Sequence, residues 1–466
     1  MKTLAPTCEK YTASLCDTEI KMTLDSNMSG ASAPLLQDSE DSQEDPNSEN
    51  GSISGAVFNI TTTMVGAGIM SIPATMKVLG IIPGFIAIVA VALITDITVE
   101  FMLRYTSSGE SITYAGMVGE SFGKFGSLAV KICVIITNLG MLIIYLIIIG
   151  DVLCGSESKG TLHLGVLQEW FGLHWWTSRA FALLFVTIFI MLPLVMLRRV
   201  DSLRYSSAIS ILLALVFVAI SSSMAFYALW SGKTQALRML PDFSKISIFD
   251  LFTTVPVLIT GFGSQVNIHP IRAELRKPSD MSIATRISLI ICVVIYFAIG
   301  FFGYLLFGDS VMADILVNFD QNSGTVVGRL LNDVVRLSYA LHLALVFPIM
   351  NYSLRANIDE LLFSNKNKPV LALDTPRFVC LTCGLLAISY ITAVALPNIW
   401  YFFQFLGSTT IAALSFIFPA AIILRDIHGI SSRKDQVMAI VVIILAVMTS
   451  GIAMWTNLNG SSADQT

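Results

Sequence analysis

Residues 54–73 read SGAVFNITTTMVGAGIMSIP, a stretch that is long and apolar enough to cross a bilayer yet contains residues that interrupt a helix. Gly66 and Gly68 favour an unwound backbone because they lack a side chain. Pro73 cannot donate a backbone hydrogen bond. The stretch therefore predicts a membrane helix that is broken near its middle.

Residues 253–270 read TTVPVLITGFGSQVNIHP and repeat this pattern. Gly261 and Gly263 again fall inside an apolar run, and a proline lies on each side of them. The two interrupted spans stand five spans apart. Interrupted helices at matching positions of two halves point to the binding site of an inverted-repeat transporter. The alternative is that the glycines only allow neighbouring helices to pack closely.

The whole composition agrees with a membrane protein. The chain has 466 residues, of which 55% are hydrophobic and 13% charged, whereas soluble chains carry about a quarter charged residues. Apolar runs long enough to span hydrocarbon recur along the chain. We expect an all-α integral membrane protein with about eleven spans, near residues 54–79, 82–104, 126–153, 179–197, 205–230, 248–271, 283–307, 329–352, 377–397, 399–424 and 436–456.

Three regions are predicted. Residues 1–50 are polar and acidic, which predicts a disordered tail. Residues 51–456 form the transporter domain, and residues 457–466 form a short tail. Lys and Arg are concentrated in the connections that lie on the same side as the amino terminus, so that side is predicted to be cytosolic and the carboxyl-terminal tail lumenal or exterior.

Broken helices suit a zwitterionic ligand. The amino ends of half-helices present N–H groups to a carboxylate, and unwound carbonyl groups suit an ammonium or a metal cation. The sequence shows no metal-ligating cluster, no nucleophile motif, few histidines and no basic patch, so we expect neither an enzyme nor a nucleic-acid partner. A channel, and a sensor built on a transporter scaffold, remain as competing interpretations.

Several motifs resemble those of the amino acid/auxin permease family, and most of all its plant vacuolar branch, which is related to sodium-coupled neutral amino acid transporters. The similarity extends over residues 50–456. It implies eleven spans, the five-plus-five inverted repeat of the leucine-transporter fold, and amino acid transport. The matching segments are Phe58-Asn59-Ile60 through Gly66-Ala67-Gly68, Pro256, Gly261-Phe262-Gly263-Ser264-Gln265, His269-Pro270-Ile271, Glu274-Leu275 and Val335-Arg336-Leu337.

The resemblance also implies a set of substrate contacts. They map to the two breaks, at Val65, Gly66, Ala67 and Gly68 and at Thr260, Gly261, Phe262 and Ser264. Asn138 and Tyr145 lie seven residues apart on one face of the third span, which lines the site in this fold, so they are candidate side-chain contacts. Hydrogen bonding between helices is an equally good explanation for these two.

The driving ion is less certain than the fold, since the chain departs from its sodium-coupled relatives. Thr62 stands where they carry an asparagine, and the apolar triplet Ala344-Leu345-Val346 aligns with a threonine of their eighth span. Hydrocarbon side chains offer no oxygen to sodium. We therefore expect proton coupling, with Thr62 in an ion site as the sodium alternative, and no bound cofactor.

Proton coupling needs a titratable group within the membrane. Asp96 in the second span and His342 in the eighth are the candidates, although each could instead hydrogen-bond a neighbouring helix. Asp333 and Arg336 lie three residues apart and are expected to form a structural pair.

The expected function is secondary active transport of neutral, conceivably acidic, amino acids across the vacuolar membrane toward the cytosol, by a monomer. A sodium-coupled transporter of the plasma membrane is the alternative.

Overall fold

The computed structural model describes residues 53–463, except 159–160, 198–203, 233, 236, 245, 321–325, 364–370, 372–373 and 397–398. The predicted tail at 1–50 lies outside these residues. The described chain is almost entirely helical, with one short antiparallel hairpin in which Ser156 pairs with His163.

The elements follow one another with short connections. The first half contains α2 (Ile53–Met64), η1 (Ala67–Ser71), α3 (Ile72–Leu79), α4 (Ile81–Ser108), α5 (Tyr114–Cys154), β1 (Ser156–Ser158), β2 (Thr161–His163), α6 (Val166–Phe171), η2 (Trp175–Thr177), α7 (Arg179–Val186), η3 (Thr187–Met191), α8 (Leu192–Val195) and α9 (Arg204–Trp230). The second half contains α10 (Ile248–Phe262), α11 (Gln265–Glu274), η5 (Pro278–Asp280), α12 (Met281–Phe307), η6 (Gly308–Ser310), η7 (Ile315–Asp320), α13 (Val326–Leu362), α14 (Thr375–Ala395), α15 (Ile399–Leu406), η8 (Gly407–Ile411), η9 (Ala413–Ile417), α16 (Phe418–Arg425) and α17 (Arg433–Ala463).

Every predicted span coincides with an apolar helical segment. In the described residues, 9 helices are long and apolar enough to cross a bilayer, or 10 when the bent pair at residues 53–79 counts as one span. The remaining predicted span, 179–197, is a shorter apolar helix at Arg179–Val195. Three bounds differ most from the prediction: α5 begins at Tyr114 rather than 126, α13 ends at Leu362 rather than 352, and α17 continues to Ala463, into the expected tail.

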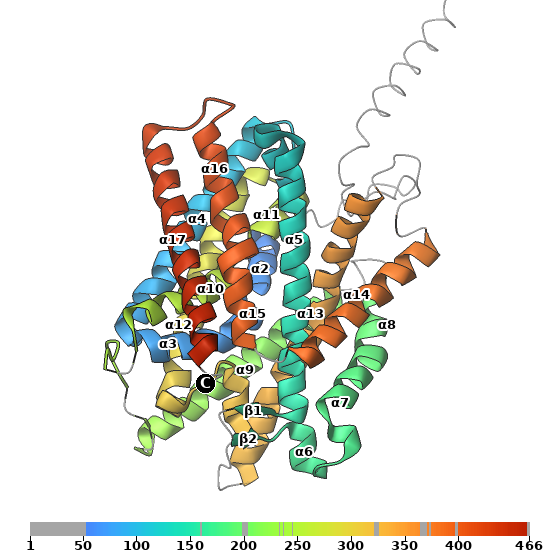
Figure 1. Ribbon diagram of the computed structural model, residues 1–466, viewed down its shortest axis with the longest axis vertical. Coiled ribbons are helices and arrows are strands. Elements are labelled where there is room, and N and C mark those ends of the chain that lie inside the picture. Colours follow the sequence, from blue (N-terminus) through green and yellow to red (C-terminus); the bar gives the residue numbers. More distant parts are fainter. Residues whose placement is uncertain are drawn as a thin grey trace, which may run out of the picture.

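The bundle has two distinct ends (Figure 1). One end carries β1, β2 and α6, and we call it the hairpin end. The opposite end carries the connection between α16 and α17 at residues 426–432, and we call it the loop end. The charge bias of the sequence predicts that the hairpin end faces the lumen or exterior.

The interrupted helices lie in the interior of the bundle. The α10 helix packs against α3, η1, α4, α15 and α17, and α5 packs against α13, α14 and η8. In an apolar stretch of 18 residues taken from each helix, 72% of the residues are buried in α5 and 28% in α17. The buried helices therefore surround the two breaks, and α17 lies at the periphery.

Candidate functional site

The first interrupted span breaks where the sequence predicts. The α2 helix ends at Met64, and η1 begins at Ala67, so Val65 and Gly66 join two half-helices bent by 50°. Gly66 has φ −119° and ψ −152°, an extended conformation open to any residue. Its backbone conformation therefore does not by itself require glycine.

The second break begins at Gly263, two residues after Gly261, which is the first glycine of this stretch. Helix α10 continues through Gly261 and Phe262, and Gly263 and Ser264 separate it from α11. The prediction that Gly261 and Phe262 are unwound is therefore wrong. Both residues still belong to the last turn of α10. The carbonyl groups of a last turn accept no hydrogen bond from within their own helix.

The two breaks touch each other. A Cβ atom built on Gly68 would lie 2.9 Å from the Cα and 3.2 Å from the backbone nitrogen of Gly261. Because this neighbour is backbone, it cannot move aside as a flexible side chain would. Glycine at position 68 therefore allows the two spans to cross in direct contact, whereas a Cβ on Gly261 would instead meet the Tyr296 ring at 3.2 Å.

Two tyrosines cap carbonyl groups at the breaks. The Tyr339 hydroxyl donates to the Gly66 carbonyl at 2.6 Å. The Tyr296 hydroxyl lies 2.6 Å from both the Met64 and the Gly261 carbonyl oxygens and shares its one hydrogen between them. The Met64 and Gly66 carbonyls also accept from the backbone, at 2.7 and 3.3 Å. A hydrogen bond contributes about 0.5–1.5 kcal/mol, so these caps add to the stability of the unwound backbone. The sequence motifs did not single out either tyrosine. The feature that could have identified them is their position as polar side chains within the apolar seventh and eighth spans.

A small cavity of about 30 Å³ lies at the breaks. Such a volume holds one or two waters and is too small for an amino acid. No charged side chain lines it among the described residues, which instead supply backbone, hydroxyl and amide groups and several apolar side chains. The lining residues are Thr63, Met64, Gly66, Gly68, Thr137, Asn138, Met141, Thr260, Gly263, Val266, Asn267, Met350 and Ile411.

The predicted contacts are placed unevenly around this cavity. Gly66, Gly68, Thr260 and Asn138 line it, whereas the other six predicted substrate residues do not. The Asn138 amide also donates to Ser353 Oγ at 3.2 Å, as the helix–helix alternative anticipated. The Tyr145 hydroxyl lies 3.3 Å from where a Gly66 Cβ would stand, so it still faces the first break.

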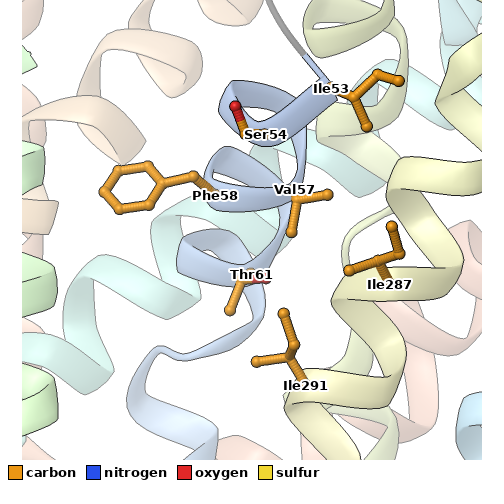
Figure 2. Close-up of a pocket in the computed structure, with 7 residues that line it drawn as sticks. All are labelled: Ile53, Ser54, Val57, Phe58, Thr61, Ile287 and Ile291. Atoms are coloured by element: carbon orange, nitrogen blue, oxygen red, sulfur yellow. The ribbon is translucent and has the colours of Figure 1, made fainter.

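A larger opening of about 440 Å³ lies between α2 and α12. Figure 2 shows Ile53, Val57 and Thr61 on α2 directed toward Ile287 and Ile291 of α12. Apart from the side chains of Ser54 and Thr61, its walls are hydrocarbon, so they offer little to a carboxylate or an ammonium group. We therefore place the substrate site at the small cavity and not in this groove.

The two sides of the first break are buried to different extents. All five residues of η1 are buried, whereas α2 buries only Ala56, Ile60 and Met64. Asn59, Thr62 and Thr63 share one more open face of α2, and Thr63 reaches the cavity. A polar face of this kind is unfavourable in hydrocarbon and suits water. The hairpin-end half of this span is therefore closely packed, and the loop-end half is less closely packed.

The ion-coupling candidates lie in different places. The Thr62 hydroxyl donates to the Phe58 carbonyl at 2.8 Å, one turn back in α2. His342 is fully buried behind the first break, with its Nδ1 atom 2.8 Å from Ser210 Oγ and the backbone of Val65 close to its ring. His342 therefore hydrogen-bonds a neighbouring helix, as the structural alternative anticipated, and it lies beside the first break.

Asp96 is remote from the breaks. Its carboxylate accepts from Arg286 Nε at 3.2 and 3.3 Å, and Arg286 also lies 3.6 Å from Glu100. This pairing between α4 and α12 favours the structural alternative for Asp96.

The expected pair of Asp333 with Arg336 is wrong. Arg336 donates to Glu169 Oε1 at 2.5 Å and to the Leu164 carbonyl at 2.6 Å, whereas Asp333 accepts from Trp170 Nε1 at 2.9 Å. The helical spacing of the two residues allowed a pair, but α6 packs against this end and supplies better placed partners.

Comparison with known proteins identifies the family of this chain. The model of the family described as "Transmembrane amino acid transporter protein" matches residues 49–456. Amino acid transporter AVT6C of Arabidopsis thaliana is 54% identical over 91% of this chain and 97% of its own length. Solute carrier family 38 member 10 of Mus musculus is 29% identical over 85% of this chain and 35% of its own.

Among solved structures, MhsT in complex with L-phenylalanine superposes with a TM-score of 0.55 at 13% identity, covering 87% of this chain and 98% of its own. This likeness concerns the fold, and it confirms the predicted leucine-transporter architecture.

Proposed function

Because the chain belongs to the transmembrane amino acid transporter family, we propose that it carries neutral amino acids together with protons, binding them at the two breaks. The observation that carries this proposal is the composition of the central cavity. Its walls combine backbone and uncharged polar groups with apolar side chains and present no charged side chain among the described residues.

These groups match the parts of a neutral amino acid. The amino ends of η1 and α11 direct N–H groups toward the breaks and suit the carboxylate. Unwound carbonyl groups and the Asn138 and Thr260 side chains suit the ammonium. Met141 and Met350 offer a polarisable apolar surface that adapts to different side chains. A monomer suffices, since one chain supplies every lining group.

Proton coupling is favoured over sodium coupling by the chemistry near the eighth span. Ala344 and Val346 are buried and apolar, so they provide no oxygen ligand. His342 lies beside the first break, and its imidazole is a group that can bind and release a proton. We therefore place the coupling proton at His342, and we place the protein in the vacuolar membrane with transport toward the cytosol.

Uptake of labelled amino acids into liposomes that carry the purified protein tests this proposal. We expect saturable accumulation of neutral amino acids under an imposed pH gradient without sodium. Accumulation that requires sodium would overturn proton coupling and direct attention to Thr62. Absence of saturable uptake under either gradient would favour the channel or sensor interpretation.

A further inference from the structure

Most of residues 311–319, in the connection between α12 and α13, is buried, although connections usually run over the surface. Within residues 311–319, which we call the plug, Val311, Ile315, Leu316, Asn318 and Phe319 are at most 3% exposed. Asn318 holds the plug together: it accepts from the Met312 N–H at 2.8 Å and donates to the Ser310 carbonyl at 2.9 Å. It is a fixed element of the hairpin end.

The plug is fastened to the first interrupted span. Ser71 Oγ at the end of η1 donates to the Ala313 carbonyl at 2.6 Å. Lys77 Nζ on α3 donates to the Val311 carbonyl at 3.0 Å. The plug also packs against α5 and α13. Because η1 and α3 form the hairpin-end half of the broken helix, movement of that half requires the plug to loosen.

Asp314 lies at the centre of these contacts and is 2% exposed. Its Oδ1 accepts from the Leu316 N–H at 2.9 Å, whereas Oδ2 has no hydrogen-bond partner in the described part of the chain. The groups facing it are Asp151 on α5 and Arg336 and Tyr339 on α13, and η1 adds no titratable group. Burial, and secondarily Asp151, raises the pKa of Asp314 to about 8, against the opposing effects of the Leu316 N–H and Arg336.

The nearby guanidinium groups are already engaged. Arg179 forms a short ion pair with Asp151, and Arg336 pairs with Glu169 at 2.5 Å. Among the described residues, these two cations therefore pair with two carboxylates, and Asp314 is a third carboxylate in the same cluster. An ionised Asp314 would leave a buried negative charge without compensation, whereas a protonated one makes the cluster neutral.

We propose that Asp314 is a proton-binding site of the closed hairpin end, and that losing this proton loosens the plug from η1 and allows that end to open. The proposal rests on the proposed function only in assuming that the hairpin end opens during transport. It requires no second ligand, because the proton comes from the solution at that end.

The sign of the pH dependence follows from linkage. The pKa of Asp314 is raised in the closed form and returns toward its ordinary value of 3.8 when the plug opens to water. Closure therefore binds a proton. The stabilisation of the closed form by this proton is complete below the ordinary pKa of 3.8 and is lost as the pH rises through about 8. Between these limits, one proton per closure changes the ratio of open to closed forms by up to about tenfold per pH unit.

Labelling of Cys154 by a membrane-impermeant maleimide tests the proposal. Cys154 ends α5 at the hairpin end and is buried in the closed form. Wild type, Asp314→Asn and Asp333→Asn would be compared in liposomes from pH 5 to pH 9, with Cys154→Ser giving the background. An amide at 314 retains the acceptor for the Leu316 N–H and imitates the protonated acid. Dividing by the Asp314→Asn rate at each pH removes the pH dependence of the thiol itself.

We expect the wild-type rate to equal that of Asp314→Asn near pH 5 and to exceed it increasingly as the pH rises, while Asp333→Asn follows wild type. A ratio that stays at one throughout would overturn the proposal. Faster labelling of Asp314→Asn at every pH would also overturn it and leave Asp314 as a structural cap of η7. Because this assay needs no amino acid gradient, its result is separate from success or failure of proton-driven uptake.

Discussion

The contact between the two breaks makes a sharp prediction for Gly68→Ala. The added methyl group would stand 2.9 Å from the Gly261 Cα, where real Cβ contacts are rarely closer than 3.4 Å. The neighbour is backbone, so relief requires the two interrupted spans to separate by about half an ångström or more. Overpacking of this kind costs about 1–3 kcal/mol, which corresponds to about a 5- to 150-fold change in an equilibrium.

We expect Gly68→Ala to reduce uptake by about this factor, because the crossing of the two spans forms the site. Gly66→Ala should be milder, since its methyl group would meet only the Tyr145 hydroxyl, at 3.3 Å. Gly384→Ala on α14 is the matched control, since nothing lies within 4 Å of its Cβ position.

The assay is initial uptake of a labelled neutral amino acid into liposomes, normalised to the amount of monodisperse protein. Normalisation separates loss of transport from loss of assembly. Wild-type uptake by Gly68→Ala, equal to that of the Gly384→Ala control, would refute the claim that direct backbone contact between the breaks is required.

Three further predictions concern buried polar groups. Tyr339→Phe removes the cap from a break carbonyl, so uptake should fall by about tenfold while the stability in detergent changes little more than for an ordinary core substitution; unchanged uptake would mean that the cap is dispensable. Arg336→Gln removes a buried guanidinium that donates to Glu169 and to the Leu164 carbonyl, and it should destabilise the protein by about 1–3 kcal/mol, measured as a lower Tm in detergent; an unaltered Tm would show that these hydrogen bonds do not stabilise the fold. His342→Gln should abolish pH-driven accumulation but retain exchange of labelled for unlabelled substrate, whereas Asp96→Asn should retain both; the reverse pattern would move the coupling proton to the second span.

Much of the architecture could be predicted from local sequence. The apolar runs set the spans, and Gly66, Gly68 and Gly263 with their flanking prolines identified both interrupted helices. These features are local because span length and helix interruption depend on neighbouring residues along one chain segment. The position of the second break was less accurate, since a glycine such as Gly261 tolerates a helical conformation when packing supports it.

Partners distant in sequence were decided by the tertiary structure. Helical spacing suggested Asp333 as the ion-pair partner of Arg336, but the packing of α6 makes Glu169 that partner instead. Asp96 looked isolated in its own span, yet Arg286 reaches it from α12.

The same holds for the site itself. The sequence by itself determined that this chain crosses the membrane many times, that two of its spans are interrupted, and that these interruptions suit a zwitterion. Packing alone brings the interruptions into contact at Gly68 and Gly261, places Tyr296 and Tyr339 on their carbonyl groups, and buries Asp314 with no hydrogen-bond partner for Oδ2 among the described residues. The physical reason is that hydrophobicity and backbone freedom belong to single segments, whereas contact, capping and charge compensation depend on which segments packing brings together.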